Sequence, residues 1–167
     1  MARERGIVIY PNPVLRARAK PVDKIYEFVR QLVADMHRVV GEEEGAGIAA
    51  PQLGESLRIF LACPSRGEEP RVFINPKIEV AGAVSPHQEG CLSLPDIFAD
   101  ILRPAFVRIT ATALDGSEFS LESDGFAARV WQHEFDHLEG MLIIDRMRPI
   151  DRLSNRRALR DLERAGG

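Results

Sequence analysis

The 167-residue sequence is short of cysteine, and it lacks the features that direct a chain to a membrane. Its two cysteines, Cys63 and Cys91, are too few for a disulfide scaffold. We find no leader of charged and then apolar residues, no lipidation motif and no apolar run of about 18 residues. We therefore expect a protein of a reducing compartment, most simply the cytoplasm, with no membrane partner and with thiols free for chemistry.

An excess of positive charge is also missing. Lys and Arg number 22 against 25 Asp and Glu, which argues against DNA or a membrane surface as the main partner. The C-terminus is the exception, because seven arginines and three acidic residues lie between Arg146 and Gly167. We expect a terminal helix at about 151–164, which either docks transiently on ribosomal RNA or is simply solvated.

Long linkers, internal repeats and low-complexity tracts are absent as well. A hydrophobic content of 45% and a charged content of 28% are typical of a globular domain. A domain of this length buries roughly 70% of its unfolded surface and needs no disulfide to hold its core. The sequence therefore predicts a single domain over residues 1–167.

Periodicity predicts helices near both ends of the chain and strands between them. Apolar residues recur at spacings of three and four over 23–40, which indicates an amphipathic helix that Gly41 ends. Branched and aromatic residues predict strands over 57–63, 72–80, 107–114 and 119–121. Asp115 and Gly116 suit the tight turn of a hairpin between the last two strands.

A further helix, capped by Asp124 and ended by Gly140, is predicted near the C-terminal third of the chain. Its spacing places four side chains on one face: Phe126, Val130, His133 and His137. The fold class is therefore α+β, with mixed or antiparallel strands around a central metal-binding helix and with helices at both ends.

The strongest chemical motif on that helix is His133-Glu134-Phe135-Asp136-His137. Residues i and i+4 are neighbours on a helix, so both imidazoles can bind one metal ion while Glu134 lies beside the open coordination position. The alternative is a pair of core histidines without metal. It is disfavoured because buried imidazole nitrogens would then need other partners.

The third metal ligand separates families that share this motif. The extended metalloprotease pattern needs a third histidine where this chain has Ile143, and the one distant downstream glutamate is Glu163, in the terminal helix. Cys91, next to Gly90, is the better candidate, since a thiolate binds soft metals strongly and glycine permits close backbone approach. Such a set leaves one coordination position for water.

Three motifs together resemble those of peptide deformylase. They are Gly45-Ala46-Gly47-Ile48-Ala49-Ala50-Pro51-Gln52, Glu89-Gly90-Cys91-Leu92-Ser93 and the histidine motif above. The opening at 10–16, Arg103-Pro104 and the stretch at 138–146 are also similar to this family, so the resemblance covers nearly the whole chain.

The resemblance implies a metal-dependent hydrolase that removes the N-formyl group from the formyl-methionine of nascent polypeptides and releases formate. It implies Fe²⁺ as the cofactor, with Zn²⁺, Ni²⁺ or Co²⁺ as substitutes. Its ligands would be Cys91, His133 and His137. Glu134 would be the acid and base, and Gln52 and the Leu92 N–H would stabilise the oxyanion.

The resemblance also implies which residues contact the substrate. The peptide would lie as an added strand beside Ala46, Gly47 and Ile48, close to Gly90, although the 45–52 segment alone could be a plain glycine turn. The helix spacing, independently of the resemblance, predicts that the methionine side chain lies against Phe126 and Val130, with Arg129 beside that wall.

His87 and Phe98 depart from common family patterns, so the resemblance assigns no substrate preference to the rim of the site. Two other functions remain as alternatives. One is an unrelated metallo-endopeptidase built on the same helix motif, and the other is a non-catalytic module that binds metal or peptide.

Overall fold

The computed structural model describes residues 4–166, and it places one antiparallel sheet of five strands among helices. The strands, in sheet order, are β1 (Gly47–Ala49), β2 (Ile59–Ala62), β3 (Arg71–Cys91), β4 (Leu94–Thr112) and β5 (Glu118–Ser123). The helices are α1 (Glu27–Glu42), α2 (Phe126–Leu138), α3 (Ile143–Arg146), α4 (Pro149–Ser154) and α5 (Arg156–Gly166). Two 3₁₀ turns, η1 (Pro13–Arg16) and η2 (Ala50–Leu53), complete the set. The predicted α+β class is confirmed, and the strands are antiparallel throughout the sheet.

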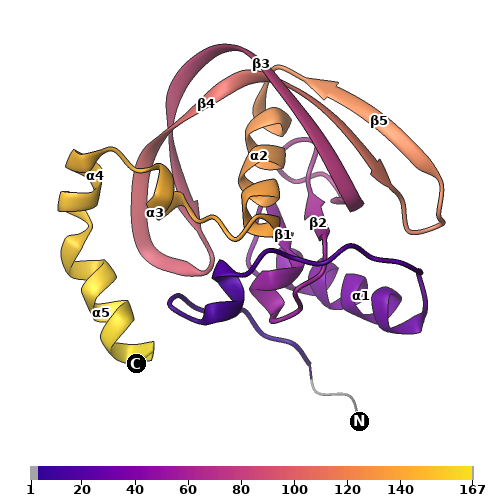
Figure 1. The fold of residues 1–167 in the computed structure, drawn as a ribbon, viewed down its shortest axis with the longest axis horizontal. Coiled ribbons are helices and arrows are strands. Elements are labelled where there is room, and N and C mark those ends of the chain that lie inside the picture. Colours follow the sequence, from indigo (N-terminus) through magenta and orange to yellow (C-terminus); the bar gives the residue numbers. More distant parts are fainter. Residues whose placement is uncertain (1–3, 167) are drawn as a thin grey trace.

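Helix α2 lies at the centre of the molecule, with β3 and β4 arching over it (Figure 1). Strand β2 is buried on both faces because it lies between two helices. Ile59 and Leu61 belong to the core cluster that includes α1, whereas Phe60 and Ala62 belong to the cluster that includes α2. A short run of four consecutive apolar residues is therefore a strand with no solvent face.

Strands β3 and β4 are much longer than the sequence predicts. Their register continues beyond the sheet as a two-stranded arm, in which Ser85 pairs with Arg103 and Glu89 with Ala99. On β4 the alternation is present, because Ile97, Ala99 and Ile101 are buried in a core cluster. The β3 half of the arm is mostly exposed and has no such alternation. Pro86 is tolerated because β3 has a single neighbour there.

The expected hairpin between β4 and β5 is confirmed. Gly116 has a φ of +90°, and the Ala113 N–H donates to the Ser117 carbonyl at 2.8 Å. The Asp115 carboxylate accepts from the Ser117 N–H at 2.9 Å, which closes the turn.

Three of the predicted helix ends are wrong and one is confirmed. Helix α1 begins at Glu27 rather than near residue 23, and it continues past Gly41. Helix α2 begins after Gly125, with no side-chain cap from Asp124. Gly140 does end the turn after α2, with a φ of +73°. A Cβ atom there would lie 2.5 Å from the Arg16 carbonyl oxygen, so only glycine fits.

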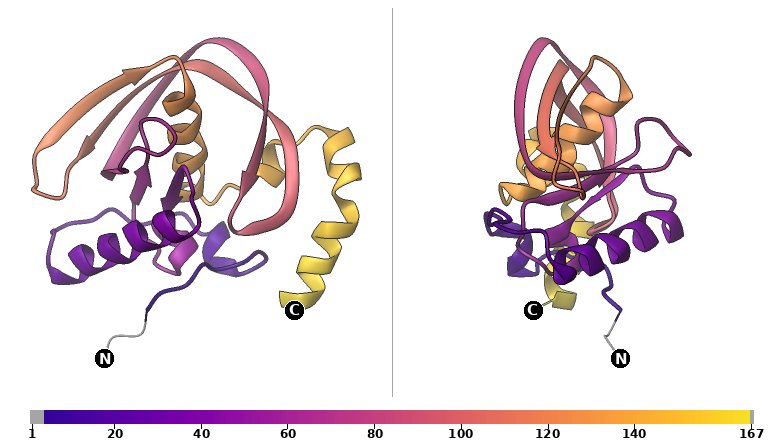
Figure 2. Two further views of the ribbon diagram at one scale, coloured as in Figure 1. Left: turned by 180° about the vertical axis from the view of Figure 1, so that it is seen from behind. Right: turned by 90° about the vertical axis from the view of Figure 1, so that its right-hand side faces the viewer.

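The C-terminal segment forms two helices rather than the one expected over 151–164. The break falls at Asn155, whose Nδ2 donates to the Asp151 carbonyl at 2.8 Å and to the Phe98 carbonyl at 2.9 Å. Helices α4 and α5 stand along one side of the molecule, beside the β3–β4 arm (Figures 1 and 2). Across residues 4–166, no helix combines the length and the apolar character that a bilayer crossing requires.

Candidate metal and hydrolytic site

Two elements far apart in the sequence bring together three side chains of the types that can bind a metal ion. His133 and His137 lie one turn apart on α2, and Cys91 ends β3, where it pairs with Leu94 across the turn into β4. Their ligand atoms all lie within 4.8 Å of one another. We call these three residues the Cys–His–His cluster.

The chemistry of the cluster fits a metal ion. Cys91 Sγ lies 3.5 Å from His137 Nε2. Burial holds the pKa of His137 well below its usual value, so its imidazole is neutral, which is the form that binds metal. A thiolate with two imidazoles suits Zn²⁺, Fe²⁺, Ni²⁺ and Co²⁺.

Glu134 lies on the same helix and is 4% exposed. Burial raises the pKa of its carboxyl group to about 7, and its Oε2 has no hydrogen-bond partner among the described residues. A Cβ atom on Gly47 would lie 3.1 Å from Glu134 Oε1 and 2.6 Å from the Leu61 carbonyl oxygen. The missing side chain at Gly47 therefore makes room for this carboxylate.

Gln52 is buried and fixed in direction. Its Oε1 accepts from the Ala49 N–H at 2.9 Å, while its Nε2 donates to Ser93 Oγ at 3.2 Å and lies 3.5 Å from Cys91 Sγ. The amide N–H group is thus aimed at the cluster. Leu92, the other expected oxyanion donor, follows Cys91 directly and lines the cavity described next.

A cavity of about 700 Å³ opens beside Glu134 and two of the three cluster residues. Most of the predicted substrate residues line it: Ala46, Gly47, Gly90, Phe126, Arg129 and Val130. His87 and Phe98 line it as well. Ile48 does not, because its side chain is fully buried in the core cluster of α1. Its expected role in substrate binding is therefore limited to its backbone, which lies in β1 at the edge of the sheet.

The three α2 residues expected in the side-chain pocket differ in their surroundings. Phe126 is 38% exposed, whereas Val130 is 8% exposed and also packs in the core between α2 and the sheet. Arg129 turns its guanidinium toward the β3–β4 arm, where it donates to the Ile101 carbonyl at 2.5 Å. The apolar wall of the cavity on this helix is thus formed by Phe126 and Val130.

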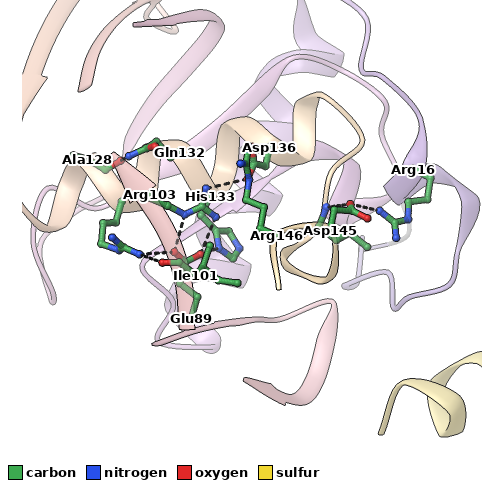
Figure 3. Close-up of polar contacts among 12 residues, drawn as sticks. Arg16, Glu89, Ile101, Arg103, Ala128, Gln132, His133, Asp136, Asp145 and Arg146 are labelled. Carbon is green, nitrogen blue, oxygen red and sulfur yellow. Dashed lines mark hydrogen bonds and ion pairs between the residues drawn. The ribbon is translucent and has the colours of Figure 1, made fainter. Parts of the chain in front are cut away.

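A chain of buried ion pairs under the cluster was missed by the sequence reasoning (Figure 3). We call it the ionic chain; its members are Glu89, Arg103, Asp136 and Arg146. Arg103 is 1% exposed. Burial opposes ionisation of Glu89, but hydrogen bonds from Arg103 and His133 outweigh it and hold the pKa of Glu89 at about 2. The sequence signal that could have indicated it is Asp136, an acidic residue between the two motif histidines on a helix with an apolar face, because a buried carboxylate needs a cationic partner.

Fold and site together define a metal-binding hydrolase with a Cys–His–His cluster and a buried carboxylate. The family model described as polypeptide deformylase matches residues 4–153. The chain is 42% identical over 159 residues to the peptide deformylase of Thermotoga maritima, covering 95% of this chain and 96% of the relative. It is 40% identical over 148 residues to that of Acinetobacter baumannii, covering 87% and 84%.

A solved structure agrees with these sequence matches. Peptide deformylase 1B of Arabidopsis thaliana, in complex with an inhibitor, superposes with a TM-score of 0.89 at 40% identity, covering 95% of this chain and 90% of that one. The chain therefore belongs to the polypeptide deformylase family. Its activity is hydrolytic removal of the N-formyl group, and neither the endopeptidase nor the non-catalytic module is favoured.

Proposed function

We propose that the chain carries out this hydrolysis with one metal ion held by Cys91, His133 and His137. The main support is that the three ligand atoms lie within 4.8 Å of one another, beside a buried Glu134 oxygen that has no hydrogen-bond partner among the described residues. Fe²⁺ is the proposed metal, and the thiolate and imidazole donors also accept Zn²⁺, Ni²⁺ or Co²⁺. When bound, the metal lowers the pKa of water and polarises the formyl carbonyl.

Glu134 is the proposed acid and base. A carboxyl group with a pKa of about 7 is half ionised near neutrality, so Oε2 accepts a proton from the attacking water and later returns it to the leaving amine. The close fit of Gly47 against Glu134 keeps the carboxylate in this position.

Gln52 and Leu92 are the proposed donors to the oxygen that becomes negative on the formyl carbon. Gln52 is suited to this role because Ala49 and Ser93 fix both ends of its amide, so it does not reorient during the reaction. One such donor typically lowers the barrier by about 3 kcal/mol.

The proposed substrate is the N-terminus of a formyl-methionyl nascent polypeptide. Strand β1 is the edge of the sheet, so its free side can pair with an extended peptide near Ala46 and Gly47. The methionine side chain would lie against Phe126 and Val130, which form the apolar wall of the cavity.

The proposed compartment is the one where such chains are made, most simply the cytoplasm. The proposed partner there is the ribosome, contacted through α5. Four arginines of α5 form no ion pair within the described chain: Arg156, Arg157, Arg160 and Arg164. They are therefore available to phosphate groups.

The test is formate release from a formyl-methionyl peptide by protein purified without oxygen, with metal analysis of the same sample. We expect turnover in proportion to bound metal and loss of both on treatment with a strong chelator. Turnover that persists in metal-free protein would contradict the proposed mechanism. Cleavage of internal peptide bonds without formate release would support an endopeptidase instead.

A further inference from the structure

We propose that Arg146 is a positioning residue for the metal centre, although its side chain lies outside the cavity. It would act through Asp136, Arg103 and Glu89 on the orientation of His133 (Figure 3). The inference rests on the metal site proposed above. It extends that site to a residue that touches neither substrate nor metal.

The last link orients the imidazole. His133 Nδ1 lies 2.9 Å from Glu89 Oε1. At this distance the Glu89 carboxylate oxygen accepts a hydrogen bond from Nδ1–H, which fixes the direction in which the ring points. The opposite ring nitrogen, Nε2, is thereby turned toward the cluster, where it would serve as the metal ligand.

The middle links hold Glu89 in place. Arg103 donates to both Glu89 oxygens, at 2.7 and 2.9 Å, through Nε and Nη2. Its remaining Nη1 donates to Asp136 Oδ2 at 3.0 Å. A planar guanidinium with two carboxylates fixed on it has little freedom to move, so Glu89 is held in one position.

The first link is Arg146. Its Nε and Nη2 donate to the two oxygens of Asp136 at 2.6 and 2.8 Å. Asp136 is thereby neutralised by an arginine of its own. Without Arg146, Asp136 and Glu89 would compete for the single guanidinium of Arg103, and the hold on Glu89 would weaken.

Arg146 is itself well supported. It ends α3, whose first turn is closed by Asp145 accepting from the Leu142 N–H at 2.9 Å. Arg16 donates to the same carboxylate at 2.5 Å, and Ile143 is buried beneath the turn. The side chain of Arg146 is 37% exposed, so substitution leaves no cavity in the core.

The first experiment loads the protein with Zn²⁺ and measures the rate of zinc transfer to a coloured chelator. We expect Arg146→Met to release zinc about tenfold faster than the unaltered chain, the scale usual for groups behind a metal ligand. Arg148→Met is the matched control, because Arg148 is two residues away, 42% exposed and paired with carboxylates outside the ionic chain. Equal release from the two variants would overturn the inference.

The second experiment asks whether Arg146 acts through Asp136. In an Asp136→Asn background we expect Arg146→Met to change zinc release by no more than about twofold, because the charge it neutralises is gone. An undiminished effect there would overturn the proposed route. Nitrogen NMR of the His133 ring in zinc-loaded Arg146→Met should show a weakened Nδ1 proton contact, which a merely structural role would not produce.

Two further readouts keep the test decisive. If Arg146→Met does not fold, Arg146→Lys takes its place, because lysine keeps the charge but loses the two-point contact with Asp136. Zinc release from Arg146→Lys equal to that of the unaltered chain would contradict the proposal. Failure of the unaltered chain to hold zinc would instead contradict the metal site itself. Zinc retained equally by all variants would contradict only the role of Arg146.

Discussion

Two arginine-rich regions of the molecule differ in what their charges touch. Under the cluster, the buried Arg103 and the partly exposed Arg146 donate to Glu89 and Asp136 at distances of 2.6 to 3.0 Å. On α5, arginines face solvent and form no ion pair within residues 4–166. The first region therefore uses charge to fix geometry, and the second leaves charge available for an external partner.

The energetic consequences are opposite. A buried charge that loses its partner is costly because it cannot be resolvated, whereas an exposed charge contributes about 0–1 kcal/mol in most ion pairs. Substitutions in the first region should therefore change metal binding and stability. Substitutions in the second should leave both unchanged and alter only association with a partner.

The largest effect is expected at the cluster that the buried region serves. Cys91→Ser should weaken zinc or iron binding by more than about 100-fold, since a neutral hydroxyl does not replace a thiolate on a soft ion. Metal analysis after gel filtration checks this. Full metal occupancy with unchanged turnover would remove Cys91 from the ligand set.

Breaking the ionic chain at its centre should have the next largest effect. Arg103→Met leaves Glu89 and Asp136 buried without their shared cation. Removal of one partner of a buried ion pair typically lowers the free energy of unfolding by about 3–5 kcal/mol, and we expect a loss of that size. Urea denaturation of the metal-free protein measures it. Arg108→Met on β4, at an exposed ion pair with Glu122, is the control, and equal losses in the two variants would contradict the distinction between buried and exposed pairs.

A smaller and more local effect is expected beside Glu134. Gly47→Ala places a Cβ atom 2.6 Å from the Leu61 carbonyl, so β1 or Glu134 must shift and kcat should fall by about 10- to 100-fold. Gly45→Ala is the control, because its Cβ atom would meet neighbours only at 3.6 Å or more. Similar kinetics in the two variants would show that the fit at Gly47 does not position the carboxylate.

The smallest effect on chemistry is expected on α5. Replacing its four arginines by glutamine should leave formate release and the melting temperature unchanged, because these side chains contact no part of the site. The same variant should lose salt-sensitive cosedimentation with ribosomes. Cosedimentation equal to that of the unaltered chain would leave α5 as a solvated helix.

The histidine pair of the cluster was predictable from sequence because its spacing is local, whereas Cys91 was selected as a ligand by its chemistry. His133 and His137 are one helical turn apart, and a strong thiolate next to a glycine, at Cys91, was the best remaining ligand. The hairpin at Asp115 and Gly116 was predictable for the same reason, since two residues determine the turn.

The ionic chain and the long arm were not predictable, because both depend on distant pairings. Arg103 meets Glu89 14 positions away and Asp136 33 positions away, and no local pattern selects these partners. The outer half of β3 lacks a core-facing alternation, so it is a strand through its pairing with β4, whose Ile97, Ala99 and Ile101 face the core. The burial of Ile48 likewise follows from α1 covering β1.

The most direct test of the account is a paired measurement on Glu134→Gln, metal content and formate release in one sample. We expect metal content equal to that of the unaltered chain, because Glu134 is not a proposed ligand. We expect turnover to fall by at least about 100-fold, because the amide cannot accept or return a proton. Turnover retained in fully metallated Glu134→Gln would contradict the central claim that this buried carboxylate moves the proton.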